Sequence, residues 1–211
     1  MSVAGLLLTP GAGSDRHHPA LLAIEAAVAP LPVLRHDFPF RRAGRRAPDR
    51  APVLVASVVE AAGELAGRTG APAGRHVLGG RSMGGRMCSM AVADGLGAAA
   101  LVLVAYPLHP PGRPDRLRTE HLPRLTVPCL FVSGTRDAFA TPDELLQATG
   151  AVPGPVTHHW VDGGRHELRG VDEEVAAVVA DWVRSLPEGG HLRDGPRDRA
   201  PRSGRLARGP G

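Results

Sequence analysis

The sequence contains no lysine, so all 25 of its lysine-plus-arginine residues are arginines. A Walker-type phosphate loop, a pyridoxal Schiff base and a serine–lysine dyad each require a lysine amine, and the sequence therefore excludes them. Aromatic residues make up only 3% of the chain, so the core must be built from alanine, valine and leucine. The longest apolar runs are far shorter than the ~20 residues that a membrane-spanning helix needs, so no membrane partner is expected.

Cysteine is equally scarce. Cys88 and Cys129 are the two cysteines of the sequence, and their spacing fits neither a disulfide scaffold nor a zinc site. The first residues lack the basic opening and the cleavage site of a signal peptide, and they read as a buried strand that runs into a glycine loop. We therefore expect a cytoplasmic protein that uses no cofactor and no metal.

The positive charge is unevenly distributed along the chain. Residues 187–211 contain six arginines and three acidic residues, whereas residues 1–186 contain 19 arginines and 18 acidic residues. The main part of the chain is thus nearly neutral, which does not favour a nucleic-acid partner. We predict one domain over residues 1–186 and a disordered tail rich in Gly, Pro and Arg over 187–211. General arginine enrichment explains this tail better than polyanion binding does, although both interpretations stay open.

Short apolar runs alternate with helical patterns throughout the predicted domain. The predicted strands are 3–9, 33–38, 76–80, 100–105, 128–133 and 156–161, and the predicted helices are 19–29, 52–68, 83–94, 141–149 and 171–186. This alternation predicts an α/β fold with a mostly parallel sheet of about six strands and helices on both faces. Ligands of such sheets bind beyond the carboxyl ends of the strands, so the loops after the strands are where chemistry is expected.

One of these loops contains a candidate nucleophile. Residues 80–84 read Gly-Arg-Ser-Met-Gly, which matches the Gly-x-Ser-x-Gly nucleophile elbow and lies between a predicted strand and a predicted helix. Serine in this turn has a strained backbone, and side chains at the flanking positions would collide with neighbouring backbone. We therefore predict that Ser82 is the nucleophile.

A serine nucleophile needs a base and a residue that orients the base. His166 follows the last predicted strand, and Asp137 follows the strand before it. The order Ser, then Asp 55 residues later, then His 29 residues later, is the order of an α/β hydrolase. The sequence alone does not dismiss the other histidines in loops or at the ends of elements, which are His17, His18, His36, His109 and His121.

The first glycine loop is the second candidate feature. We expect the backbone N–H groups of Ala12 and Met83 to form the oxyanion hole. Gly11-Ala-Gly13 also resembles the start of a dinucleotide-binding fingerprint, but Arg16 stands where the third glycine would be. A nicotinamide-dependent enzyme is therefore not favoured.

The sequence resembles the small α/β hydrolases grouped as dienelactone-hydrolase-like, in particular the branch shared by bacterial predicted hydrolases and a eukaryotic chromatin-complex subunit. The motifs behind this resemblance are residues 8–13, 79–85, 105–112, 118–123, 132–137 and 163–166. The resemblance implies the roles given to Ser82, Asp137 and His166. It also implies a histidine before Gly-Ala-Gly, and Pro10 stands there instead.

These residues predict a serine hydrolase that cleaves a small ester, thioester or lactone through an acyl-enzyme. We take Tyr106, His109, Arg45 and Arg116 as candidate substrate-binding residues, because they lie in loops at the active-site end of the predicted sheet. Arg45 and Arg116 belong to two groups of loop arginines that would favour an anionic substrate if they are more than a solvated surface. These groups are Arg41, Arg42, Arg45 and Arg46, and Arg113, Arg116 and Arg118. The loop at about 106–127 is too short for a cap domain, so we expect a shallow, open site. The alternative function is a non-catalytic binding or scaffold protein with the same fold.

Overall fold

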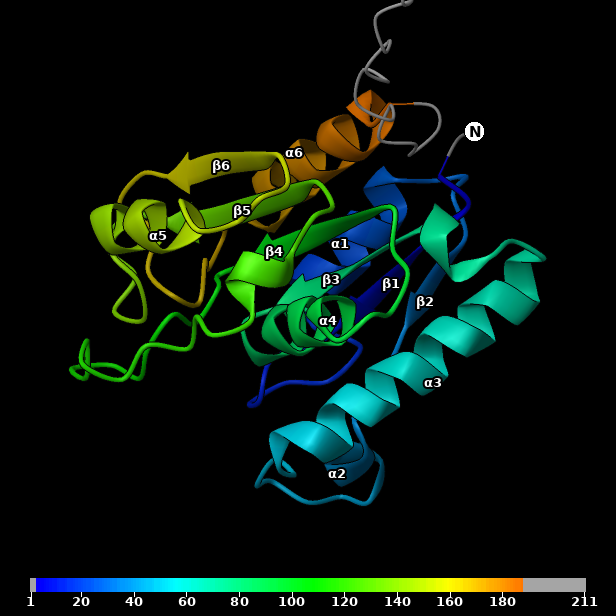
Figure 1. Ribbon diagram of the computed structural model, residues 1–211, viewed down its shortest axis with the longest axis horizontal. Coiled ribbons are helices and arrows are strands. Elements are labelled where there is room, and N and C mark those ends of the chain that lie inside the picture. The colour runs from blue at the N-terminus through cyan, green and yellow to red at the C-terminus, as the bar shows by residue number, and fades with distance from the viewer. Residues whose placement is uncertain (1–2, 188–211) are drawn as a thin grey trace, which may run out of the picture.

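The computed structural model describes residues 3–187 and contains one sheet of six parallel strands (Figure 1). Its strand order is β2-β1-β3-β4-β5-β6. The strands are β1 (Gly5–Thr9), β2 (Val33–Arg35), β3 (His76–Arg81), β4 (Ala100–Val104), β5 (Cys129–Gly134) and β6 (Val156–Val161). Each lies within a few residues of a predicted strand, and the expectation of a mostly parallel sheet of about six strands is confirmed.

Helices cover both faces of this sheet (Figure 1). α1 (Pro19–Ala27) and α6 (Asp172–Ser185) pack on one face, and α3 (Ala51–Thr69), α4 (Met83–Ala93) and α5 (Pro142–Thr149) pack on the other. Alternate residues of β1 supply the two cores, since Leu6 and Leu8 face α1 and α6 while Leu7 faces α3 and α4. All three leucines are fully buried, as a central parallel strand requires.

The sequence prediction was wrong at the end of β2. The predicted strand 33–38 stops at Arg35, and the chain enters a short helix, α2 (Pro39–Arg42). Phe38 and Phe40 are fully buried and stack on each other with ring centroids 6.4 Å apart. The apolar pattern therefore continues into the core after the strand has ended, because Pro39 fixes φ at the start of a helix.

The connections set where the loops lie. All six strands are parallel, so their carboxyl ends meet at one edge of the sheet. The chain passes from β1 outward to β2 and then returns past β1 to β3, which makes the β1–β3 boundary the topological switch point. The segments after β1, β3, β5 and β6 therefore converge at the edge where the candidate residues were predicted.

The short segment between β4 and β5 limits what can cover that edge. Between β4 and β5 the described chain forms only one 3₁₀ turn, η2 (Leu122–Arg124), so this segment contains no cap domain. The other 3₁₀ turn, η1 (Ala73–Arg75), precedes β3.

Within residues 3–187, no helix is long and apolar enough to cross a membrane. Most of the predicted disordered tail, residues 188–211, lies outside the described residues.

Candidate active site

Ser82 lies in the turn between β3 and α4, with φ 51° and ψ −120°. A non-glycine residue in such a conformation stores roughly 1–3 kcal/mol of strain, and the surrounding structure must hold it there. The Ser82 N–H donates to the Val104 carbonyl oxygen at 2.8 Å. A β-carbon would lie 2.1 Å from the Thr9 carbonyl oxygen at position 80, and 2.5 Å from it at position 84. Glycine is therefore needed on both sides of Ser82 because β3 and α4 pack closely on the end of β1.

The three residues predicted as a triad form one chain of hydrogen bonds. Ser82 Oγ lies 2.8 Å from His166 Nε2, and His166 Nδ1 lies 2.8 Å from Asp137 Oδ2 and 3.0 Å from Oδ1. An ionised carboxylate only accepts hydrogen bonds, so His166 Nδ1 must hold the proton of the neutral ring. His166 Nε2 is then free to accept the hydrogen of the Ser82 hydroxyl.

Hydrogen bonds between a hydroxyl and a histidine are common in this protein, and the third partner sets this one apart. Four other pairs have a ring nitrogen within 3.0 Å of a hydroxyl: Ser57–His36, Thr69–His76, Ser89–His121 and Thr149–His158. Within the described part of the chain, His166 alone among these histidines also contacts a carboxylate. Burial lowers the pKa of the other four, which favours their neutral form.

The loops that carry Asp137 and His166 are joined backbone to backbone. The N–H of Thr135 donates to Val161 O at 3.0 Å, and the N–H of Arg136 donates to Gly164 O at 2.8 Å. A β-carbon on Gly134 would lie 2.1 Å from the Gly164 carbonyl oxygen. These contacts continue the β5–β6 pairing beyond the strands and fix Asp137 and His166 relative to each other.

Asp137 is held on several sides. Its side chain is fully buried, and Oδ1 accepts the N–H of Phe139 at 2.8 Å in addition to the His166 contact. The Phe139 ring stacks on the His166 ring with centroids 3.9 Å apart and 27° between the planes. Phe139 therefore restricts the rotation of the imidazole, a role that the sequence analysis missed although Phe139 lies only two residues after Asp137.

Arg81, inside the elbow motif, ties the histidine loop to β3. It is 9% exposed, and its Nη2 donates to the His166 carbonyl oxygen at 2.9 Å. Burial lowers the pKa of this guanidinium, and the carboxylates of Glu167, Asp137 and Asp172 counteract that effect. This contact fixes the backbone of the proposed base, whereas Asp137 contacts its side chain.

A cavity of about 450 Å³ opens beside Ser82. It is lined by Ala12, Gly13, Pro48, Asp49, Ala51, Leu54, Arg81, Ser82, Met83, Arg86, Met87, Pro107, Arg118, Phe139 and His166. Met83 is the first residue of α4, where the backbone N–H groups have no partner inside the helix and the helix dipole favours negative charge. Ala12 lines the same cavity, and its carbonyl oxygen accepts a hydrogen bond from Arg41 at 3.1 Å. Both predicted oxyanion-hole residues therefore border the space beside Ser82.

The predicted substrate-binding residues do not line this cavity. Tyr106 is 1% exposed and bonds with His121 at 3.2 Å, so it belongs to the core and does not line the cavity. His109 is 5% exposed and contacts Glu144. Arg45 pairs with Asp49 at 2.8 Å from outside the wall, and Arg116 is exposed on the β4–β5 segment.

Arg81, Arg86 and Arg118 line the cavity instead. The position of Arg86 could be expected from the sequence. It follows Ser82, the N-cap residue of α4, by four residues and therefore lies on the side of the helix that faces Ser82. Nothing in the local pattern distinguishes Arg118 from its neighbours, since it lies in a segment without regular structure.

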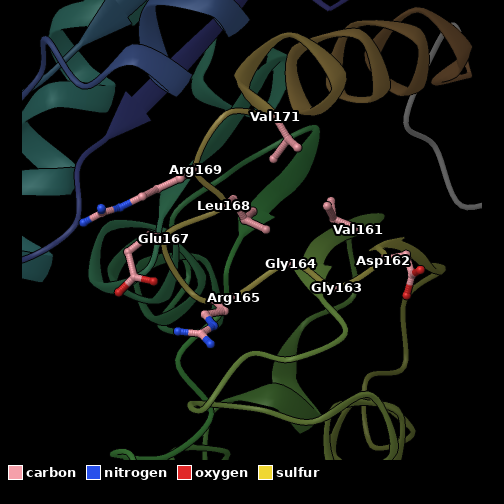
Figure 2. Close-up of a pocket in the computed structure, with 9 residues that line it drawn as sticks. All are labelled: Val161, Asp162, Gly163, Gly164, Arg165, Glu167, Leu168, Arg169 and Val171. Carbon is pink, nitrogen blue, oxygen red and sulfur yellow. The ribbon is translucent and has the colours of Figure 1, made fainter.

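A second hollow of about 300 Å³ lies along the segment between β6 and α6. Figure 2 shows the residues that line it. It is lined by residues from Val161 at the end of β6 to Val171 before α6, and it includes none of Ser82, Asp137 and His166. Leu168 in this loop is 4% exposed with φ 47°, so the loop is anchored by a buried side chain between the exposed Glu167 and Arg169. No group of three or more potential metal ligands occurs within residues 3–187.

Comparisons with known proteins agree with this architecture. A sequence model of the alpha/beta hydrolase domain matches residues 2–181. The fold is similar to that of an alpha-beta serine hydrolase homologue from Coxiella burnetii (15% identity, TM-score 0.68, 86% of each chain covered). It is also similar to dienelactone hydrolase from Anabaena variabilis (19% identity, TM-score 0.68, 88% of each chain covered). A third similar structure is the type II thioesterase BorB of the borrelidin biosynthetic cluster (20% identity, TM-score 0.61, 85% of this chain and 92% of that chain covered). At these identities the structural likeness concerns the fold.

Proposed function

Because the chain belongs to the alpha/beta hydrolase domain family, we propose that it is a cytoplasmic serine hydrolase that cleaves small esters, thioesters or lactones through an acyl-enzyme. One observation carries this proposal, namely the continuous hydrogen-bonded series Asp137–His166–Ser82 beside an accessible cavity. A serine hydroxyl is a weak nucleophile until a base removes its proton, and this series supplies both the base and the group that orients it.

In the first half of the proposed reaction, Ser82 Oγ attacks the substrate carbonyl carbon while its proton moves to His166 Nε2. The bond between Oγ and carbon forms, and the carbonyl oxygen becomes an oxyanion. The N–H groups of Met83 and Ala12 are the proposed donors to this oxyanion, and they act together with the positive end of α4. The bond to the leaving oxygen or sulfur then breaks, and the leaving group takes the proton from His166 Nε2.

In the second half, water replaces the leaving group. His166 Nε2 accepts a proton from the water as its oxygen attacks the acyl carbon, and the same proton passes to Ser82 Oγ when the acyl–serine bond breaks. Asp137 keeps its negative charge throughout and stabilises the imidazolium that forms twice in the cycle. Esters, thioesters and lactones all present a carbonyl with an oxygen or sulfur leaving group, so one set of residues serves all three.

The size of the cavity supports a small substrate. Its volume of about 450 Å³ lies at the lower end of the range of small-molecule sites. Its wall combines apolar contacts from Leu54, Met87 and Phe139 with the arginines. The walls leave room for an acyl group of a few carbons together with a small leaving group.

Labelling with a fluorophosphonate probe tests this proposal. We expect the wild-type protein to be labelled, and Ser82→Ala and His166→Ala to abolish the labelling. Ser57→Ala is the matched control, since Ser57 Oγ also lies 2.7 Å from a histidine nitrogen, but on His36 and without a carboxylate. Labelling that disappears with Ser57 and persists without Ser82 would contradict the proposal. A folded wild-type protein that is neither labelled nor active on a neutral ester would favour the alternative of a non-catalytic binding protein.

A further inference from the structure

Two arginines in the wall of the cavity have no counter-charge. Arg86 and Arg118 line the cavity beside Ser82, yet neither takes part in an ion pair with any residue in the described range 3–187. Their guanidinium groups donate no hydrogen bond to those residues either, and Nε of Arg86 is a buried donor with no acceptor. A buried donor without a partner destabilises the folded protein, so this arrangement needs an explanation.

We propose that Arg86 and Arg118 bind an anionic group, a carboxylate or a phosphate, of the acyl substrate while Ser82 attacks its carbonyl. This inference rests on the proposed function and adds the substrate class to it. The guanidinium fork matches the oxygens of both anions and forms charge-assisted hydrogen bonds that are stronger than neutral ones.

The backbone at both arginines is held in place by a buried polar network. Ser89 Oγ donates to the Arg86 carbonyl oxygen at 2.8 Å and accepts from His121 Nε2 at 2.8 Å. Tyr106 Oη donates to the Arg118 carbonyl oxygen at 3.4 Å and lies 3.2 Å from His121. The network thus links α4 to the β4–β5 segment and brings two guanidinium groups to the same wall before any ligand binds.

The charges around this wall are unbalanced. Burial, followed by the charge of Arg86, lowers the pKa of Arg118, which means that the two cations lie close enough to repel each other. Asp49, the acidic residue that lines the cavity, already pairs with Arg45 at 2.8 Å. Burial lowers the pKa of His121 to about 4, so this histidine is neutral near pH 7. An anion in the cavity would relieve the repulsion that the protein itself leaves in place.

The other arginine in the wall is already engaged. Arg81 donates to the His166 carbonyl oxygen and has three carboxylates in its surroundings, so it serves the catalytic loop. Arg86 follows Ser82 by one helical turn on α4, so the anionic group would lie near the reacting carbonyl. Small half-esters of dicarboxylic acids and aryl esters with a charged ring carry an anionic group and a reactive carbonyl in one molecule, as this inference requires.

Matched ester pairs test the inference. The first pair is para-acetoxybenzoate and its methyl ester, and the second is mono-p-nitrophenyl adipate and its methyl ester. In each pair the carboxylate is the difference, either on the leaving group or on the acyl chain. We expect wild-type kcat/KM to favour the anionic member of at least one pair about tenfold or more, which corresponds to about 1.4 kcal/mol. Phosphate analogues of the same pairs then decide which anion is preferred.

Arginine variants locate the preference. Arg86→Gln and Arg118→Gln should each lower the anionic-to-neutral ratio of kcat/KM about tenfold, and either variant suffices if the other does not fold. Arg116→Gln is the control, because it removes an equal charge from the same β4–β5 segment outside the cavity. An anionic-to-neutral ratio of kcat/KM near one in both wild-type pairs would overturn the inference. So would an unchanged ratio in both arginine variants, or an equal loss of the ratio in Arg116→Gln.

A binding measurement separates this inference from the proposed function. In Ser82→Ala, calorimetric titration with the anionic ester of at least one pair should give a Kd at least tenfold lower than titration with its methyl ester, and adding Arg86→Gln should remove the difference. This result would support the anion site even in a protein that does not hydrolyse either ester. Equal Kd values for the anionic and neutral esters in both pairs would overturn the inference, even in a protein that hydrolyses the neutral esters well.

Discussion

Two glycines that both lie inside helices give a sharp test of the packing around Ser82. Gly84 lies in α4, and Gly63 lies in α3. Alanine is favoured over glycine in a helix by roughly 1 kcal/mol, so both Gly→Ala substitutions receive the same intrinsic gain. A β-carbon at position 63 has no heavy atom within 4 Å, whereas one at position 84 lies 2.5 Å from the carbonyl oxygens of Thr9 and Pro10.

The expected outcomes therefore differ in sign and in kind. Gly63→Ala should raise Tm by roughly 2–4 °C, since 1 kcal/mol corresponds to such a shift in a domain of this size. In Gly84→Ala the obstacle is backbone, so α4 and the loop after β1 must separate by at least about 0.5 Å, at a cost of roughly 1–3 kcal/mol. The separation moves Ala12 away from Ser82, and a misplacement of ~1 Å can cost about 10²-fold in rate.

Thermal unfolding and turnover of a neutral p-nitrophenyl ester measure both effects in the same samples. We expect the kcat of Gly84→Ala to fall about 10- to 100-fold, and the clash to cancel the stability gain from alanine. Gly63→Ala should keep the wild-type kcat. A Gly84→Ala protein that is as stable and as active as Gly63→Ala would refute the reasoning that close contact at position 84 fixes the site.

Two further predictions concern single side chains. Asp137→Asn should lower kcat by about 10³- to 10⁴-fold without unfolding the protein, because an amide no longer enforces the proton on His166 Nδ1. Ester turnover measures kcat, and circular dichroism shows whether the protein is folded. A loss of kcat below tenfold would contradict the role of Asp137. His121 has a folded-state pKa of about 4 against an ordinary value of 6.5, so between these pH values the unfolded state binds a proton that the folded state does not. The free energy of unfolding therefore keeps its full His121 contribution above pH 6.5 and falls as the pH decreases toward 4. Urea unfolding at several pH values should therefore show a loss about 2–3 kcal/mol larger in the wild type than in His121→Gln, and parallel losses would exclude His121 as the source.

The sequence predicted the sheet well because a parallel strand that is covered on both faces must be apolar throughout. The run at 100–105 is an example, since β4 occupies Ala100–Val104 and every residue in it is buried. The boundary at Phe38 was wrong for a related reason. Burial alone does not reveal whether a buried aromatic side chain extends from a strand or from the start of a helix.

The three residues proposed as the triad could be chosen from sequence because each follows the carboxyl end of a strand, and the fold brings these ends to one edge. The residues that line the cavity could not be predicted from their place after a strand. Arg45 and Arg116 lie in loops at the expected edge, but loop side chains follow no periodicity that would say where they point. The position of Arg118 instead depends on Tyr106, which meets its backbone in the folded molecule.

The joining of the Asp137 and His166 loops has a consequence for how such a site can change over evolutionary time. The backbone contacts of Gly134, Thr135 and Arg136 with the His166 loop fix the proposed acid–base pair without using Ser82. The proposed nucleophile, Ser82, lies in the separate turn between β3 and α4, where its side chain can be exchanged while the pair stays in position. A descendant with cysteine at position 82 would inherit an oriented imidazole at once, whereas a descendant with a larger residue at position 134 would have to rebuild both loops.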